Sequence, residues 1–189
     1  MISLAGLTLV LLLLGAGGLL WLNGSQLAPV IGGPFTLQDG DGHTVTDRDL
    51  HGKYLLVYFG YTFCPDVCPT TLTAVADAVD KLGAKADQLQ PLFITVDPKR
   101  DNAATVKQYA ASFTPRLIGL TGTPDQIATV AREYRVYHVE HRTGPGPNDY
   151  SIDHSSILYL MAPDGRFIAP IDAGQSGDQI AAAIRKLTS

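Results

Sequence analysis

The sequence is poor in cysteine and in charge of either sign, and both shortages restrict what the protein can be. Only two cysteines, Cys64 and Cys68, occur among 189 residues, so any thiolate chemistry must involve this one pair. The formal net charge is −4, and with so modest a charge no nucleic-acid partner is expected. No internal repeat or low-complexity segment is visible. With 46% hydrophobic residues, the composition indicates one membrane-attached globular domain.

Charge is missing altogether from the first segment. Residues 1–23 contain no charged side chain, and residues 4–22 form an apolar run. At about 1.5 Å per residue this run reaches roughly 28 Å, enough to cross a hydrocarbon core of about 30 Å. The sequence therefore predicts a transmembrane anchor at 1–23, a linker at 24–33 and a globular domain at 34–189.

A cleaved signal peptide is the competing interpretation of the first segment. Against it are the length of the apolar run, the absence of a basic residue before it, and the poor cleavage candidate at Ala28, which Pro29 follows. The first basic residue is Arg48, so orientation is weakly specified. A cysteine pair that works where thiols are oxidisable favours a domain outside the cytosol. That compartment is the periplasm or, for a processed organellar protein, the mitochondrial intermembrane space.

The two cysteines lie where a predicted strand meets a predicted helix. Residues 54–60 form the continuous apolar run typical of a strand buried on both faces, whereas Leu72 and Val75 begin a helical spacing of apolar residues. Because proline disfavours helical dihedrals in the residue before it, we expect Cys68 near the N-cap and Pro69 at the first helical position. The helix N-terminus favours thiolate, the form that attacks disulfides and binds metals.

Four interpretations of the cysteine pair remain open on this evidence. The pair can form a structural disulfide, serve as two buried apolar residues, act as a redox pair, or supply half of a metal site. A disulfide closing so short a loop restricts the unfolded chain only slightly. The strand-to-helix setting and the lack of other cysteines therefore favour chemistry at Cys64 and Cys68.

The rest of the domain alternates buried strands with amphipathic helices. The predicted elements are, in chain order, a hairpin around the turn at 39–42, a strand at 92–96, a helix capped by Asp101, a helix beginning at Thr123 and Pro124, an extra strand at 136–141, a loop at 143–148, a hairpin of 157–161 with 167–171, and a helix that begins at Ser176. The order β-α-β-α, then β-β-α, is the thioredoxin-like arrangement. We predict an α/β thioredoxin-like fold with an N-terminal hairpin and an inserted strand and loop.

Five short segments together resemble the Sco/SenC family of membrane-anchored copper proteins. They are residues 59–62, 64–69, 96–101, 119–123 and 153–155. The match extends over roughly residues 34–187 and includes the anchor. Asn102 is a small departure, because threonine is common there in the family, and it affects only a helix start.

The resemblance implies that a cysteine pair and one distant histidine bind a single copper ion, for assembly of the dinuclear copper centre of cytochrome c oxidase. Mapped onto this chain, these ligands are Cys64, Cys68 and His154. Their chemistry agrees, since two thiolates and an imidazole form a soft donor set that suits Cu(I) and leaves room for a further ligand on Cu(II). Zinc can use the same ligands, but copper binds such sites more tightly, so copper is the expected cofactor.

Without the resemblance, a ligand role for His154 is the weaker interpretation of that residue. The other four histidines are expected to lie in solvated segments or at the surface: His43, His51, His138 and His141. Although His138 and His141 are close in sequence, on a strand they point to opposite faces.

The aspartates near the expected site each allow two interpretations. Asp66 either orients a thiol or caps the helix. Asp97 and Asp153 are candidates to accept a hydrogen bond from an imidazole, as such partners often do at metal sites, although a turn or an ion pair explains Asp97 equally well. Tyr61 and Phe63 are expected to be apolar walls that limit water.

Two classes of function remain open. In the first, the protein is a metallochaperone that receives copper from another copper chaperone and delivers it to the copper-bearing subunit of cytochrome c oxidase. In the second, Cys64 and Cys68 form a thiol-disulfide oxidoreductase that reduces the oxidase cysteines. Both imply a thioredoxin-like reductant, because a disulfide would block the thiolates. A sensor role is weaker, and a peroxidase is disfavoured because the residues before Cys64 lack the Thr-x-x-Cys spacing of peroxiredoxins.

Overall fold

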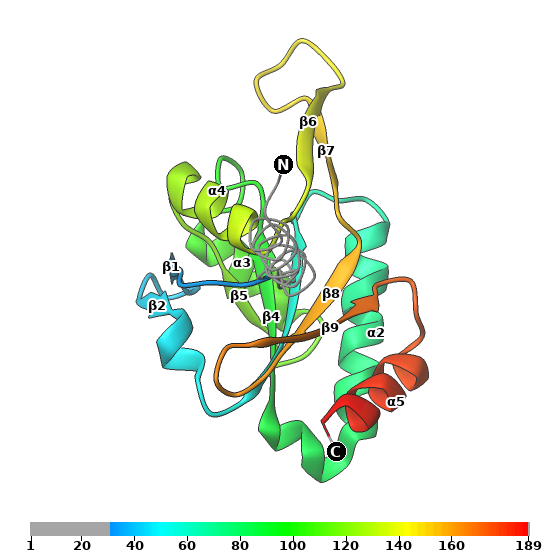
Figure 1. The fold of residues 1–189 in the computed structure, drawn as a ribbon. Coiled ribbons are helices and arrows are strands. Elements are labelled where there is room, and N and C mark those ends of the chain that lie inside the picture. The colour runs from blue at the N-terminus through cyan, green and yellow to red at the C-terminus, as the bar shows by residue number, and fades with distance from the viewer. Residues whose placement is uncertain (1–30, 189) are drawn as a thin grey trace, which may run out of the picture. The chain divides into compact units, whose positions relative to one another are not determined.

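A five-stranded mixed sheet forms the centre of the structure, a computed structural model that describes residues 31–188 (Figure 1). The strand order is β5-β4-β3-β8-β9. The first three strands in this order are mutually parallel, β8 runs antiparallel to β3, and β9 runs antiparallel to β8. Their bounds are Tyr54–Gly60 (β3), Leu89–Thr95 (β4), Ile118–Leu120 (β5), Ile157–Met161 (β8) and Phe167–Asp172 (β9).

Helices cover both faces of this sheet. Alternate residues of β3 separate the two cores, with Leu56 and Tyr58 on one side and Val57 and Phe59 on the other. The first core includes residues of α2 (Val67–Leu82), α3 (Ala103–Ala111) and α5 (Gly177–Leu187), and the second includes residues of α4 (Pro124–Glu133). Burial of β3 on both faces explains why its sequence is apolar without alternation.

Two hairpins lie outside the central sheet. The first joins β1 (Thr36–Gln38) to β2 (Thr44–Thr46), and the second joins β6 (His138–Arg142) to β7 (Tyr150–His154). Each forms a two-stranded sheet of its own, and the β6–β7 hairpin projects away from the central sheet in Figure 1. Two 3₁₀ helices, η1 (Asp47–Leu50) and η2 (Gly83–Gln88), complete the connections.

Apart from β7, the predicted element order is confirmed, including the N-terminal hairpin, the β8–β9 hairpin and the last helix capped by Ser176. Two helix starts differ from the prediction. Helix α2 begins at Val67, so Pro69 is its third residue and not its first. Proline is tolerated there because the first N–H groups of a helix have no intrahelical partner.

The cap of α3 is also wrong in the sequence-based prediction. Asn102 is the N-cap, and its side chain accepts a hydrogen bond from the Thr105 amide at 3.0 Å. Asp101 is fully buried and binds other donors. In addition, no strand was predicted for Tyr150–His154 (β7), so the single inserted strand is in fact a two-stranded hairpin.

Among residues 31–188, no helix is both long enough and apolar enough to cross a membrane. The predicted anchor at 1–23 lies outside the described residues.

Candidate metal centre

The cysteine pair lies in the connection from β3 to the first turn of α2. Cys64 is half-buried and Cys68 is fully buried, and both are free thiols. The backbone amide of Cys68 donates to the Cys64 Sγ at 3.4 Å. This contact is the one expected where a sulfur lies against the unpaired N–H groups of a helix N-terminus.

A buried carboxylate fixes the segment just before Cys64. Asp101 accepts hydrogen bonds from the Thr62 amide at 2.9 Å and from the Thr62 hydroxyl at 2.5 Å. It also accepts a bond from the Thr95 hydroxyl at 2.6 Å, at the end of β4. The cysteine turn is therefore held against the carboxyl ends of β3 and β4 by groups that are shielded from water.

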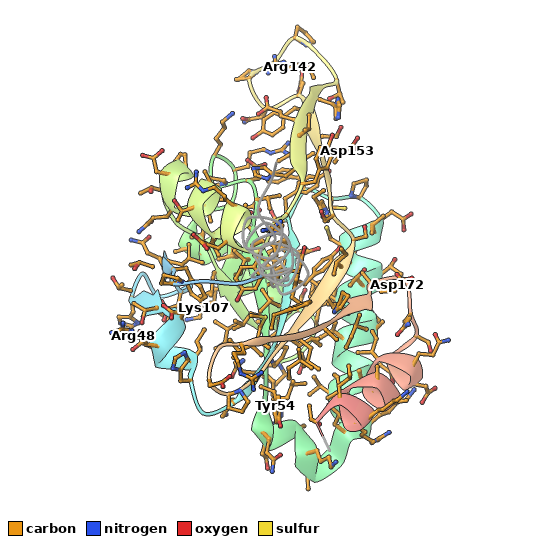
Figure 2. All side chains as sticks on the ribbon, in the orientation of Figure 1. Arg48, Tyr54, Lys107, Arg142, Asp153 and Asp172 are labelled. Carbon is orange, nitrogen blue, oxygen red and sulfur yellow. The ribbon has the colours of Figure 1, made fainter. Side chains whose placement is uncertain are left out.

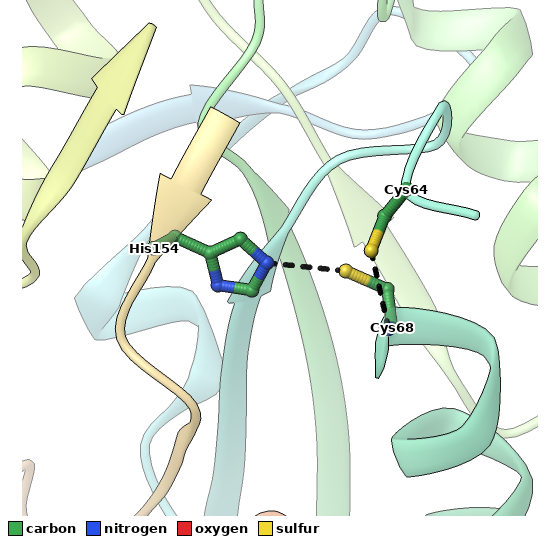
Figure 3. Close-up of side chains that lie close together, drawn as sticks. All are labelled: Cys64, Cys68 and His154. Carbon is green, nitrogen blue, oxygen red and sulfur yellow. Dashed lines mark hydrogen bonds between the residues drawn. The ribbon is translucent and has the colours of Figure 1, made fainter. Parts of the chain in front are cut away.

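His154 is the last residue of β7, and it reaches the cysteines from the inserted hairpin (Figure 3). Its Nε2 lies 3.3 Å from the Cys68 Sγ, and its Nδ1 lies 3.1 Å from the Ser155 carbonyl oxygen. A carbonyl can only accept, so this contact places the imidazole proton on Nδ1 and leaves Nε2 free to act as an acceptor or a ligand. The rings of Tyr58 and Tyr61 stand edge-on to the imidazole, each with a centroid separation of 6.0 Å.

The three predicted ligands thus come together. The sulfur atoms of Cys64 and Cys68 and a nitrogen of His154 lie within 4.8 Å of one another. Metal–sulfur bonds of about 2.3 Å and metal–nitrogen bonds of about 2.0 Å let one ion bridge donors separated by up to about 4.6 Å. The three donors therefore lie close to the separations that one shared ion requires, and their softness fits copper better than a hard cation.

The two thiols share one proton unequally. The hydrogen bond from Cys68, opposed by burial and assisted by the nearby backbone amides, lowers the pKa of Cys64 to about 3. The same bond and burial raise the pKa of Cys68 far above its ordinary value. The negative charge of the pair therefore resides on Cys64, the more accessible sulfur.

Two residues of β3 support Cys68, and sequence reasoning did not single them out. The Tyr58 hydroxyl donates to the Cys68 Sγ at 3.8 Å. Gly60 approaches the same sulfur so closely that a Cβ added there would lie 2.8 Å from it. The one available signal was a glycine that ends an otherwise bulky apolar run, which suggests a close approach by another group.

The predicted partners of the imidazole are not confirmed. Asp97 instead pairs with Arg100 at 2.5 Å, which was the alternative interpretation. Asp153 lies near the base of the hairpin, and its largely exposed side chain pairs with His141 at 3.1 Å (Figure 2). The imidazole binds a backbone carbonyl, for which the sequence carries no signal.

The remaining predictions around the site are partly wrong. Asp66 is the N-cap residue of α2, but its side chain makes no capping bond. Tyr61 is a buried wall as expected, whereas Phe63 is 59% exposed and lies beside the Arg100 guanidinium.

His138 was expected at the surface, and its position is more specific than that. It lies directly opposite His154 in the β6–β7 ladder, and its Nδ1 is buried and has no hydrogen-bond partner among residues 31–188. The opposite orientation of His141 is confirmed by its bond to Asp153. His43 is exposed and pairs with Asp39 in the first hairpin.

Comparison with known proteins identifies the family. The SCO1/SenC family model matches residues 23–189, which is most of the chain. The chain belongs to the SCO1/SenC family. Human "Protein SCO1 homolog, mitochondrial" is 43% identical over 162 residues, covering 82% of this chain and 52% of the relative. The chain therefore spans about half the length of that curated SCO1/SenC relative.

Solved structures of SCO1/SenC proteins have the same fold. Arabidopsis thaliana ScoI, solved with copper bound, has a TM-score of 0.78 and 42% identity, covering 84% of this chain and 98% of its own. BsSco, described as a cytochrome c oxidase assembly protein with a disulfide switch, has a TM-score of 0.64 and 26% identity, covering 85% and 94%. The predicted α/β thioredoxin-like class is confirmed by these likenesses.

Proposed function

We propose that this protein is a copper metallochaperone that delivers copper for assembly of the dinuclear copper centre of cytochrome c oxidase. The observation that carries the proposal is the convergence of Cys64, Cys68 and His154 within 4.8 Å. It is supported by membership in a family of which one member has been solved with copper bound and another is described as an oxidase assembly protein. The copper ion is both ligand and cargo.

Each of the three residues has a distinct task in this proposal. Cys64 offers a thiolate without first losing a proton, because its pKa lies far below neutral pH. Cys68 must release its proton when it binds the ion. His154 keeps its proton on Nδ1, against the Ser155 carbonyl, and presents Nε2 to the metal. Since Cys64 is half-exposed, an incoming thiolate of a partner can replace it first during transfer.

A second candidate function is reduction of a disulfide in the oxidase subunit. Cys64 has the accessible thiolate that attacks a disulfide, and Cys68 lies beside it to resolve the mixed disulfide. Two electrons then pass to the target, one thiol proton goes to the leaving sulfur, and a thioredoxin-like reductant must restore the pair. The disulfide switch reported for BsSco favours keeping this candidate.

An anaerobic titration of the full-length chain with Cu(I), against a chromophoric competitor, separates the two candidates. A chaperone is expected to bind one equivalent tightly in the reduced form and none in the disulfide form. A purely redox protein should show no tight one-to-one site, and that result would refute the copper proposal.

The same proposal places the domain at 34–189 outside the cytosol, on a linker at 24–33 and an anchor at 1–23. That compartment is the bacterial periplasm or the mitochondrial intermembrane space, where a copper donor and a reductant act on the chain. Carbonate washing and protease protection test this placement. Recovery of a soluble chain shortened by about 28 residues would contradict the anchor.

A further inference from the structure

Arg100 lies between the cysteine turn and the histidine hairpin. It belongs to the loop from β4 to α3, and its side chain is only 6% exposed. Its Nε donates to Asp97 Oδ2 at 2.5 Å, so the buried charge is paired. The guanidinium is thus fixed in orientation by a carboxylate that is itself only 2% exposed.

On the hairpin side, Arg100 binds backbone and ring atoms of β7. Its Nη1 donates to the carbonyl oxygens of Asn148 at 3.1 Å and Tyr150 at 2.9 Å. The guanidinium lies 3.6 Å from the centre of the Tyr150 ring, and the Tyr150 hydroxyl donates to Asp97 Oδ1 at 2.8 Å. Arg100, Asp97 and Tyr150 therefore form a closed set of contacts at the start of β7, the strand that ends in His154.

On the cysteine side, the same guanidinium contacts two aromatic rings. The Phe63 ring centre is 4.8 Å away and the Tyr61 ring centre is 5.6 Å away. Phe63 immediately precedes Cys64, and the Tyr61 hydroxyl accepts a hydrogen bond from the Ile152 amide of β7 at 3.3 Å. One side chain therefore contacts segments that carry donors from both halves of the site.

These contacts replace a sheet ladder. Within the described residues, β6 and β7 pair only with each other and not with the central sheet. A two-stranded hairpin alone is marginally stable, so its placement depends on side-chain contacts at its base. We propose that Arg100 is a positioning residue that holds β7 so that the His154 imidazole meets the cysteine sulfurs.

Arginine is suited to this task and lysine is not. A planar guanidinium can pair with a carboxylate, donate to two carbonyls and stack on an aromatic ring at the same time. A lysine retains the charge and approximately the length, but it has a single side-chain nitrogen. It can therefore keep the bond to Asp97, but it loses the stacking on the aromatic ring and the simultaneous bonds to the two carbonyls. Arg100→Lys is therefore a sharper test than removal of the side chain.

The inference rests on the proposed copper site, and its test uses the full-length chain loaded with Cu(II). We expect Arg100→Lys to weaken Cu(II) binding by about 10 to 100-fold, as loss of a group that orients a ligand does. At full loading, its absorption and electron paramagnetic resonance spectra should shift toward those of His154→Ala. Arg142→Lys is the matched control, because Arg142 donates to four carbonyls of the hairpin tip (Figure 2). Its hydrogen bonds within residues 31–188 include none to Asp97 or to the cysteine turn.

A double variant shows whether Arg100 acts through His154. If it does, Arg100→Lys should cause little further loss of affinity once His154→Ala is present. If Arg100→Lys fails to fold, Tyr150→Phe takes its place, since it removes only the hydroxyl bond to Asp97, and a smaller loss in the same direction is expected. Wild-type spectra and affinity in the foldable variant, or fully additive losses in the double variant, overturn the inference. Failure of the wild-type chain to bind copper would instead refute the proposed function.

Discussion

The two halves of the candidate site are held in different ways. The cysteine half is contiguous in sequence, joins the central strand β3 to α2, and is fixed by a fully buried carboxylate, Asp101. The histidine half is a hairpin with a largely exposed β6, and its attachment depends on the contacts of Arg100 and Tyr61. Local folding therefore suffices to bring Cys64 and Cys68 together. His154, in contrast, reaches the cysteines only through tertiary contacts between segments that are distant in sequence.

Loss of a cysteine is expected to have the largest effect on copper binding, because it removes a thiolate ligand from the half of the site that local folding forms. Cys64→Ser or Cys68→Ser should abolish tight Cu(I) binding, since a hydroxyl is a hard and poorly ionised donor. Competitive titration of the reduced full-length chain measures this. Oxidation to the disulfide should have the same effect, and equally tight binding by the oxidised chain would rule out a two-thiolate site.

Loss of the histidine should damage only the other half. His154→Ala is expected to weaken Cu(II) binding at least 10 to 100-fold while leaving the fold and the disulfide chemistry of Cys64 and Cys68 nearly intact. Circular dichroism, a thiol redox titration and a Cu(II) titration test the three statements together. If oxidase assembly is normal in cells carrying this variant, thiol exchange and not a three-ligand site carries the function.

The negative charge of the site should lie on the cysteine half, as the thiolate of Cys64. With the pKa of Cys64 at about 3, alkylation by iodoacetamide at mildly acidic pH should be much faster than for a free thiol, and Cys64→Ser should remove the fast phase. Because this pKa is depressed on folding, the stability due to Cys64 is lost as pH falls toward 3. The raised pKa of Cys68 has the opposite sign, so its contribution is lost as pH rises above the value in the unfolded chain. A single alkylation step with an ordinary thiol pKa would contradict the shared-proton arrangement.

The smallest expected effect is on the free energy of unfolding, and it compares a buried carboxylate beside the cysteine turn with an exposed one in the hairpin. Asp101→Asn replaces an acceptor by a donor opposite the Thr62 and Thr95 groups, and we expect a loss of about 1–3 kcal/mol in the free energy of unfolding by urea. Asp153→Asn is the control in the hairpin. Its contact with His141 is mostly exposed, so a change of about 0–1 kcal/mol is expected. Equal losses in the two variants would mean that the exposed contact within the hairpin stabilises the fold as much as the buried bonds of Asp101 beside the cysteine turn.

What could be predicted from the sequence follows the same division. The β3-to-α2 connection was predictable because its apolar pattern and its cysteines are adjacent in the chain. Strand β7 was missed although Tyr150 and Ile152 alternate with the less buried Ser151 and Asp153, a signal of a half-buried strand that is weak over so few residues.

The error at α3 has a different cause. Both Asp101 and Asn102 are good N-cap residues, so local preference could not choose between them. Thr62, 39 residues earlier, bonds the Asp101 carboxylate and leaves Asn102 as the cap. The site ligands as a set needed the family resemblance, because no local pattern connects His154 to a turn 86 residues away.

The separation of the β6–β7 hairpin from the central sheet also has a kinetic consequence. In the part of the chain that the structure describes, this hairpin shares no ladder with another sheet. Such a segment can open by a local fluctuation, without the cost of global unfolding. An ion held partly by His154 can then dissociate at a rate governed by that local opening. Amide hydrogen exchange should accordingly be faster in residues 138–154 than in β3. The difference between the two exchange rates measures how easily the hairpin opens, and so how easily the ion can dissociate.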